Sequence, residues 1–502
     1  METFPIARPT FSAAAGEADD GEDRITALSD DLRRRVVSRL PVQDAVRTTA
    51  LSTRWRRVWH STPLVLYDAH LDPDDEPARV AAVDRVLAAH PGPFHTVHLG
   101  SCHLRGHRRE LVRWWPILAD RHVRDLALVS LPPGQLEELL TADMVLRLPA
   151  DILRCAELER LYLGFCVFPD TAYLPDGAGA FPHLRELAMI SSGIQGRDLD
   201  HMLASSPVLE TLALVDIGGP KRVRLYGQKL QCVLLGVSTA AKIAVVDAPR
   251  LERLIMWETI PPSHGGMPRM RVKITRDAPE LRVLGYLEPR VHKLRIGNTL
   301  IKADTEVSPR SIVPSVKILG LRVNFGVFKE VQMLASFLRC FPNIETLHVE
   351  YALAGEPTVE HYAEFFRELS PIQCVRSHIK MVVLHEFHGD PSELVFLKYL
   401  SERANELQKL ILVYSEPAKL LAPMGQIEYF LQSLAVQSGA SETCMVLLMG
   451  CDPEVDLLDF HRASNLSIDD PFLQDGLCFL SLIRGENIEQ AITTIMLMNT
   501  HQ

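Results

Sequence analysis

A short pattern of apolar positions recurs along most of the chain. A first apolar residue is followed by apolar residues three and five positions later, so that they occupy positions 1, 4 and 6 of each copy. Because successive side chains of a strand point to opposite faces, positions 4 and 6 point the same way, which predicts a short strand with one face in the core. The copies are Phe94/Val97/Leu99, Val123/Leu126/Leu128, Leu158/Leu161/Leu163, Leu184/Leu187/Met189, Leu209/Leu212/Leu214, Leu251/Leu254/Met256, Leu281/Leu284/Tyr286, Val316/Leu319/Leu321, Ile344/Leu347/Val349, Ile379/Val382/Leu384 and Leu407/Leu410/Leu412.

Neighbouring copies are mostly separated by about 25–35 residues, close to the spacing of leucine-rich repeats. Proline often stands two residues before position 1, where the start of a strand tolerates its missing amide donor. Helical segments such as 198–205 and 331–340 precede several copies. We therefore expect helix–turn–strand units that stack into a curved solenoid, with a parallel sheet on the concave side and helices on the convex side. Three copies have Cys102, Cys166 or Asn324 at position 9. A small polar side chain there can form hydrogen bonds with backbone atoms of the following turn.

The segment 23–60 has a different, helical pattern. Ser29 is a predicted N-cap, and Leu32, Val36 and Leu40 follow at intervals of four as one apolar stripe. Pro41 closes this helix; a second helix is expected over 44–51, and a third after Ser52 that carries Trp55 and Trp59 on one face. Three helices of this length bury little apolar area, so the unit is expected to need a partner for its apolar face.

These residues closely resemble the F-box. The resemblance rests on Asp23-Arg24-Ile25, the turn at 28–31, Leu40-Pro41, Ala45-Val46-Arg47-Thr48 and, above all, the segment from Leu51 to Trp59. The chain departs from the family pattern at Ser29, where proline is usual. A generic helical hairpin with aromatic core residues is the alternative interpretation. The resemblance implies that the segment binds a Skp-type adaptor, while Arg54, Trp55 and Trp59 fix the hairpin and its edge. The predicted adaptor-binding set is Leu28, Ser29, Leu32, Val36, Leu40, Pro41, Val42, Leu51, Arg54 and Trp55.

The order strand–turn–helix–strand over 379–412 resembles the FBD domain that accompanies F-boxes in many plant proteins, although one more ordinary repeat would look the same. Segments 460–464 and 469–472 resemble the tail of the same family more faintly. The expected fold is a mixed helix-and-strand repeat: a three-helix F-box, then an irregular leucine-rich-repeat horseshoe ending in FBD-like repeats. The expected boundaries are 1–22 for a disordered tail, 23–68 for the F-box, 78–370 for the solenoid, 371–450 for the FBD-like repeats and 451–502 for a C-terminal extension.

Charge favours a protein partner over nucleic acid. The chain carries a net charge of −10, whereas residues 24–60 hold nine Arg, no Lys and three Asp. No series of base-stacking aromatic residues accompanies these arginines, and the resemblance implies an acidic adaptor, so electrostatic steering toward a protein is the better explanation.

Nine cysteines without CxxC pairs favour reduced thiols in the cytoplasm or nucleus. Neither a signal peptide nor a membrane-spanning run is expected.

The sequence gives little support for catalysis. His385-Glu386-Phe387-His388 lacks one residue of the HExxH zinc motif, and His95, His98, Cys102, His103 and His107 are not expected to converge on one metal. No phosphate-binding glycine loop and no GxSxG elbow are present. We therefore expect a non-catalytic protein without cofactor or metal: the substrate receptor of an SCF-type (cullin–RING) ubiquitin ligase. The alternative is a repeat scaffold or small-molecule receptor not engaged with a ligase, which Ser29 favours; an enzyme is a third hypothesis. The target protein cannot be read from the sequence.

Overall fold

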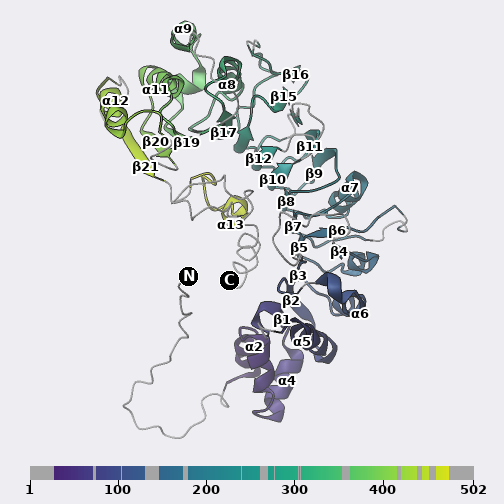
Figure 1. Ribbon diagram of the computed structural model, residues 1–502. Coiled ribbons are helices and arrows are strands. Elements are labelled where there is room, and N and C mark those ends of the chain that lie inside the picture. Colours follow the sequence, from purple (N-terminus) through teal and green to yellow (C-terminus); the bar gives the residue numbers. More distant parts are fainter. Residues whose placement is uncertain are drawn as a thin grey trace, which may run out of the picture.

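The chain forms an open arc of stacked repeats with a small helical unit at one end (Figure 1). The structure is a computed structural model that describes residues 28–473, except 72–74, 103, 131–145, 173, 175–178, 239, 260–269, 276–277, 304, 306, 353–361, 415–419, 438–443 and 451–459. The predicted tail 1–22 and most of the predicted C-terminal extension lie outside these residues. Among the described helices none combines the length and the apolar content that a membrane crossing requires.

The N-terminal unit consists of the three predicted helices, α2 (Asp30–Val37), α3 (Val42–Thr48) and α4 (Thr53–Ser61). The Ser29 hydroxyl accepts the amide of Leu32 at 3.4 Å, which confirms the predicted N-cap. The Ser52 hydroxyl accepts the amide of Trp55 in the same way at 3.3 Å and starts α4. The second helix begins and ends earlier than predicted, because Pro41 stands directly before its first residue instead of ending α2.

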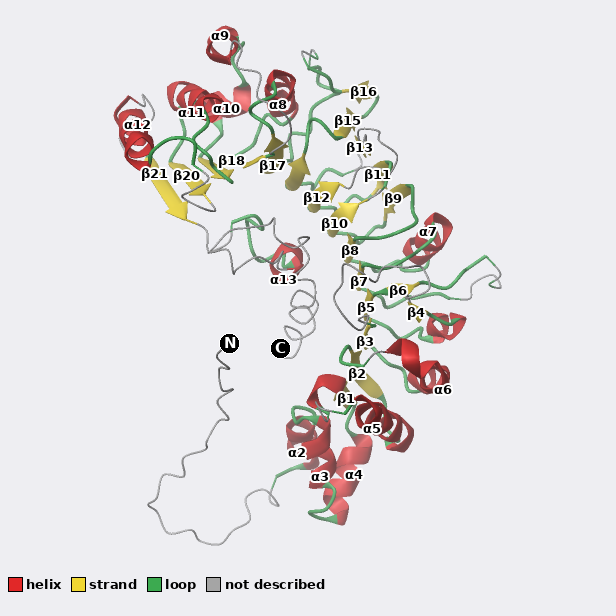
Figure 2. Ribbon diagram, in the orientation of Figure 1, coloured by secondary structure: helices red, strands yellow, loops and turns green. Residues whose placement is uncertain are grey.

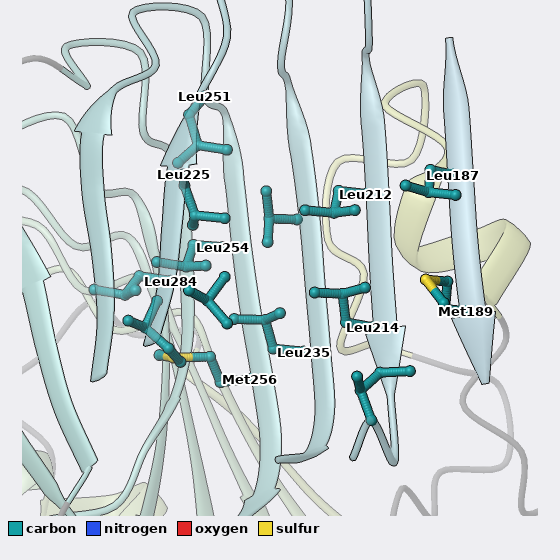
Figure 3. Packing of buried hydrophobic residues seen from close by; sticks show 14 of the residues in the cluster. Leu187, Met189, Leu212, Leu214, Leu225, Leu235, Leu251, Leu254, Met256 and Leu284 are labelled. Carbon is teal, nitrogen blue, oxygen red and sulfur yellow. The ribbon is translucent and has the colours of Figure 1, made fainter. Parts of the chain in front are cut away.

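One parallel sheet of 14 strands lines the concave side of the arc (Figure 2). Positions 4 and 6 of the repeats meet across neighbouring strands: Leu187 pairs with Leu212, and Met189 pairs with Leu214. These side chains point away from the concave surface into one continuous core (Figure 3). The predicted solenoid is therefore confirmed. The copy 281/284/286 is an exception: the register shifts between Leu284 and Leu287, so Leu287 takes the inward position predicted for Tyr286, and Tyr286 lies in the cluster on the concave side. Its strands are β1 (Leu64–Tyr67), β2 (Phe94–Leu99), β3 (Asp125–Val129), β5 (Arg160–Gly164), β7 (Glu186–Ile190), β8 (Thr211–Val215), β10 (Cys232–Ser238), β12 (Arg253–Thr259), β14 (Val283–Leu287), β17 (Ile318–Val323), β18 (Thr346–Tyr351), β19 (Met381–His385), β20 (Lys409–Tyr414) and β21 (Met445–Gly450).

Three strands of this sheet were not predicted. The strand β10 has the repeat pattern in Leu230, Val233 and Leu235, and it fills the wide interval between the copies that begin at Leu209 and Leu251. The other two, β1 and β21, are the edge strands, where one side has no repeat to pack against. Both have apolar residues at positions 4 and 6 but a polar residue, Ser61 or Thr443, at position 1, so they do not match the full pattern.

The prediction of helices along the whole convex side was wrong for the middle of the arc. There a second sheet of five strands covers the core, built from β9 (Arg222–Tyr226), β11 (Lys242–Asp247), β13 (Met270–Ile274), β15 (His292–Ile296) and β16 (Thr299–Leu300). Figure 2 shows it outside the main sheet. Its sequences alternate charged and apolar residues, a period of two that a helix cannot bury.

Helices and short 3-10 segments cover the rest of the convex side (Figure 1). Near the N-terminal end Trp114 and Trp115 of α6 are fully buried against the sheet. Near the other end α11 carries Phe396 and Leu397 into the core. The elements are α5 (Glu76–Ala89), α6 (Arg108–Asp120), α7 (Gly196–Ala204), α8 (Phe328–Cys340), α9 (Tyr362–Glu368), α10 (Gln373–Ser377), α11 (Pro391–Arg403) and α12 (Met424–Gln437), with 3-10 turns at Asp68–His70, Leu104–His107 and Ala150–Arg154 and the short strands β4 (Leu146–Arg147) and β6 (Cys166–Val167).

Candidate functional sites: an exposed helical face and a covered concave face

The helices α2 and α3 and the turn after α3 leave four large apolar side chains in solvent. Leu32 and Val36 of α2 are 47% and 43% exposed, and Val46 and Leu51 are 41% and 65% exposed. The opposite sides of the same helices are buried, since Val37 and Val42 are 2% exposed. We call Leu32, Val36, Val46 and Leu51 the apolar face of the helical unit. Several large apolar side chains exposed on one small unit are typical of protein-binding surfaces.

The predicted adaptor-binding residues divide into three groups in the structure. Ser29, Leu32, Val36, Pro41, Leu51 and Arg54 are exposed, and Leu28 and Leu40 are half-buried. Val42 and Trp55 are 2% and 6% exposed, so their side chains support the helices from inside and do not line the surface, which corrects that part of the predicted set. Sequence reasoning missed Val46 as a surface residue, although it lies within Ala45-Val46-Arg47-Thr48.

A charged cluster holds α2 against α4. The Asp30 carboxylate lies 3.0 Å from Arg33 Nη1 and 2.8 Å from Arg54 Nε. The hydrogen bond from Arg54 is the largest of the effects that lower the pKa of Asp30. The Arg33 side chain is 1% exposed, and its guanidinium lies 5.5 Å from the ring centroid of Trp55, which is a cation–π contact. This cluster fixes the orientation of the apolar face.

The concave surface of the sheet is covered in its middle by a distant part of the chain. Residues 460–473, which include α13 (Phe460–Ser464), lie inside the arc, and we call them the C-terminal strap (Figure 1). Arg253 of β12 is 3% exposed and donates Nη1 to the carbonyl of Ala463 at 2.9 Å; its Nη2 donates to the carbonyl of Ile468. Hydrogen bonds from a charged donor to buried carbonyls are among the stronger ones in proteins.

The other end of the strap inserts an aromatic ring and a carboxylate. Phe472 is fully buried, with its ring centroid 5.0 Å from that of Tyr286 and 5.3 Å from that of His348. His348 Nε2 donates to the Asp470 carboxylate at 2.9 Å, and His348 Nδ1 lies 2.9 Å from Nε2 of His385. Burial opposes ionisation of Asp470, but the charge and hydrogen bond of His348 outweigh it and lower the pKa of Asp470. Burial lowers the pKa of His385 well below the usual value.

Among the described residues, the last strand of the sheet keeps apolar side chains exposed on its concave side. Met445, Leu447 and Met449 of the edge strand β21 are 52%, 37% and 43% exposed. Their partners in register, such as Ile411 opposite Leu447, belong to the concave row of the sheet. The faint resemblance noted at 460–472 thus corresponds to a segment that packs on the sheet, and only three-dimensional proximity could have placed it there.

The histidine-rich stretch is distributed over separate partners. His98 is buried against Asp125 at 3.2 Å, whereas His107 lies 3.2 Å from Glu76. His103 lies outside the described residues. No group of three or more potential metal ligands occurs in the described part of the chain.

The described cysteines are free thiols, and six of the seven are buried. Burial raises the pKa of the Cys155, Cys166 and Cys232 thiols to about 12. These groups remain protonated near neutral pH, which suits packing and not nucleophilic chemistry. At position 9 of its repeat, Asn324 accepts the amide of Gly326 with its side-chain oxygen at 2.8 Å, as predicted for that position.

Comparisons with known proteins identify three segments of the chain. A domain model for the F-box matches residues 25–67, and a model for the FBD matches residues 367–412. Between them, a model for the LRR repeats of FBD-associated F-box protein At5g56370 matches residues 111–349. These ranges follow the order expected from the sequence.

Curated relatives come from Arabidopsis thaliana. The F-box/FBD/LRR-repeat protein At1g13570 is 26% identical over 220 residues, which cover 41% of this chain and 49% of the relative. The F-box/LRR-repeat protein At3g26922 is 30% identical over 195 residues, which cover 38% of this chain and 60% of the relative. The chain thus spans 49% and 60% of the lengths of these two relatives. The putative F-box/FBD/LRR-repeat protein At5g44950 is 24% identical over 466 residues, which cover 86% of this chain and 100% of the relative.

The helical unit, the repeat array and the segment that follows it thus agree in order and position with three domain models and with these relatives. The chain thus carries an F-box, leucine-rich repeats and an FBD segment, the combination that the names of its Arabidopsis thaliana relatives also give.

Proposed function

We propose that this protein is the substrate-receptor subunit of an SCF-type ubiquitin ligase and that the apolar face of its F-box binds a Skp-type adaptor. The observation that carries the proposal is the exposure of Leu32, Val36, Val46 and Leu51 on one small unit whose other side is already buried. Transfer of such side chains from water to a protein interface is favourable by roughly 25 cal/mol per Å² of apolar area. The arginines around the face would steer it toward an acidic partner.

The repeat array would hold the target protein. A stacked array presents a wide curved surface whose outward side chains can vary without loss of the core. The role of the chain would then be proximity: it would raise the effective concentration of target lysines near the ubiquitin carrier and would break no bond itself. We propose accordingly that the protein is non-catalytic and acts in the cytoplasm or nucleus. We also keep the boundaries 23–68, 78–370 and 371–450 for its three parts.

The proposal is tested by charge substitutions on the apolar face. In a pull-down with a purified Skp-type adaptor, the wild-type chain should bind, and the double variant Leu32→Asp/Val36→Asp should not. Both side chains are exposed, so the fold should persist. The control is Val112→Asp on α6, a side chain that is 61% exposed but lies outside the F-box. This variant should bind the adaptor as the wild type does.

Failure of the folded wild-type chain to bind any Skp-type adaptor would leave the alternative, a repeat scaffold or small-molecule receptor outside a ligase. Ser29 is the residue to test in that event. Its φ of −66° matches the angle that proline fixes, so Ser29→Pro restores the usual family residue with a compatible backbone. Adaptor binding that appears only in Ser29→Pro would show that this position had disabled the F-box.

A further inference from the structure

The outward face of the five-stranded convex sheet is made of cations. Its inner residues, among them Val223, Ile243 and Leu294, are at most 2% exposed and pack against the core. Its outer residues meet side by side across four parallel strands. One row, in register, contains Arg222, Lys242, Arg271 and Lys293; the next contains Arg224, Ala244, Lys273 and Arg295.

These cations have almost no carboxylate partners. Arg224 forms an ion pair with Asp200 at 3.1 Å. Within the described residues no carboxylate forms an ion pair with Lys221 or with the other six cations of the two rows. Adjacent strands lie about 4.8 Å apart, so neighbouring like charges repel. An ordinary exposed face carries both positive and negative side chains. This face carries mainly positive ones, although the whole chain has a net charge of −10.

The cations surround a hollow of about 740 Å³. Its wall includes Gly196, the first residue of helix α7, which lies beside β9 at the edge of the convex sheet (Figure 1). No atom lies within 4 Å of the position that a Cβ of Gly196 would occupy, so the helix start is open to the hollow. The N-terminal end of a helix adds partial positive charge to the basic side chains. The basic side chains of the wall are Lys221, Arg222, Arg224, Lys242 and Arg271.

We propose that this hollow is a binding site for a compact polyanion, a molecule that carries at least two clustered phosphate groups. Guanidinium groups bind phosphate oxygens in pairs, and a bound polyanion would relieve the repulsion within the rows. The volume falls in the range of small-ligand sites. Neither row contains an aromatic residue on which a base could stack, which favours a small ligand over a nucleic acid.

Asp200 orients the ligand within the hollow. It is the carboxylate of the wall, and Arg224 holds it on the side of α7. The phosphates therefore lie toward Arg222, Lys242 and Arg271, and a ligand hydroxyl can donate to Asp200. This inference does not depend on the proposed ligase function, because the convex face lies on the other side of the core from the concave surface.

The test is calorimetric titration of the full-length chain with inorganic tripolyphosphate. Binding should weaken with added salt. The variant Lys242→Glu/Arg271→Glu should lose at least about tenfold in affinity. Its melting temperature should not fall, because repulsion within the row is removed. Asp200→Asn should bind more tightly than the wild type. The control Lys329→Glu/Arg367→Glu makes the same change of net charge at exposed positions of α8 and α9 and should bind tripolyphosphate as the wild type does.

Vesicles with and without phosphatidylinositol bisphosphate distinguish the sources of the phosphates. Vesicle binding that tripolyphosphate competes away would identify a lipid headgroup; tripolyphosphate binding without vesicle binding would identify a free ligand. Either result supports the site. Three results would overturn it: no heat of binding with tripolyphosphate, an equal loss in the control variant, or tighter binding of a single-stranded oligonucleotide than of tripolyphosphate.

Discussion

Gly236 is a residue whose size is set by its neighbour across the sheet. It pairs in register with Trp257 of β12, and a Cβ at Gly236 would lie 2.3 Å from two carbons of the indole ring. Trp257 is 8% exposed, so its ring has little freedom to move away. The contact lies beside the C-terminal strap, within the same apolar cluster on the concave side.

We expect Gly236→Ala to lower the free energy of unfolding by about 1–3 kcal/mol, because an added methyl group in a packed site forces side chains from their preferred positions. Chemical denaturation of the purified chain measures the change. Gly218→Ala is the matched control, since no atom lies within 4 Å of its Cβ position. That variant should differ from the wild type by less than about 0.5 kcal/mol. Equal stabilities for the two variants would contradict the argument.

At the residue scale, the sequence placed Leu32 and Val36 on the side of the first helix that binds a partner, and both are exposed on α2 in the structure. It did not indicate what the other side of α2 buries. The buried side carries Arg33, whose charge is paired with Asp30 and whose guanidinium lies on Trp55. A pattern of apolar residues cannot predict a buried arginine, because its burial depends on partners from another helix.

At the element scale, helix α11 begins at a buried carboxyl group. Glu393 is 1% exposed and accepts the amides of Asp390 at 2.8 Å and His388 at 3.2 Å. Burial raises the pKa of Glu393 to about 8 despite these donors. The folded chain therefore holds a proton there at neutral pH, whereas the unfolded chain releases it at about pH 4.5.

The contribution of this proton to stability is complete below about pH 4.5 and is lost as the pH rises through about 8. Denaturation curves between pH 6 and pH 9 should therefore show a loss of stability, on the order of 2 kcal/mol, that Glu393→Gln removes. The control Glu402→Gln, at an exposed position of the same helix, should lose as much stability between pH 6 and pH 9 as the wild type does. An unchanged pH profile in Glu393→Gln would show that the carboxyl group is ionised in the fold.

The C-terminal strap gives a second prediction at this scale. Arg253→Met removes the donors to the carbonyls of Ala463 and Ile468. A hydrogen bond to a charged group contributes roughly 1.5–3 kcal/mol. Hydrogen exchange of strap amides should therefore become about 10- to 100-fold faster. Arg282→Met, which changes an exposed arginine just before β14, should leave the strap protected. Unchanged exchange in Arg253→Met would mean that Phe472 and Asp470 hold the strap alone.

Elements with a strong local period were predictable, and those fixed by distant contacts were not. The repeat strands follow from positions 4 and 6, and α8 and α11 follow from their apolar spacing. The convex strands alternate over only five or six residues, as in Arg222-Val223-Arg224-Leu225, and were overlooked beside the longer repeat. The strap has no regular pattern, because its burial depends on Arg253 and His348 of strands far away in sequence.

At the scale of the whole molecule, the F-box and the repeat array share one core. The buried cluster that contains Val37 and Trp55 continues without interruption through Leu64 into the array. The chain leaves α4 directly into β1, the first strand of the main sheet, which pairs with β2. A rigid connection of this kind fixes the position of the apolar face relative to the concave surface. The expected boundaries, 23–68 for the F-box and 78–370 for the solenoid, assign β1 to the F-box, although β1 pairs into the main sheet.

His90 lies at this junction and makes the connection sensitive to acid. Its ring lies 4.7 Å from that of Trp59, and its Nε2 donates to the carbonyl of Thr62 at 3.0 Å. Burial lowers the pKa of His90 to about 4, so the folded chain keeps the ring neutral. The unfolded chain takes up the proton near pH 6.5, and the stability contributed by the neutral ring is complete above that pH and falls toward pH 4.

We expect the free energy of unfolding to fall by an amount on the order of 3 kcal/mol from this group between pH 6.5 and pH 4. In His90→Phe the free energy of unfolding should fall less steeply on acidification than in the wild type. At pH 7 this variant should be less stable, because the carbonyl of Thr62 loses its hydrogen-bond donor. Burial also lowers the pKa of His292 to about 4, so the difference between the wild type and His90→Phe isolates the junction. His183→Phe, at a position 56% exposed, is the control and should keep the wild-type slope. Because the core is shared, the protection factors of amides, which correct for the pH dependence of intrinsic exchange, should fall on acidification in α4 and β1 together. A fall in α4 alone would show that the F-box opens independently of the array.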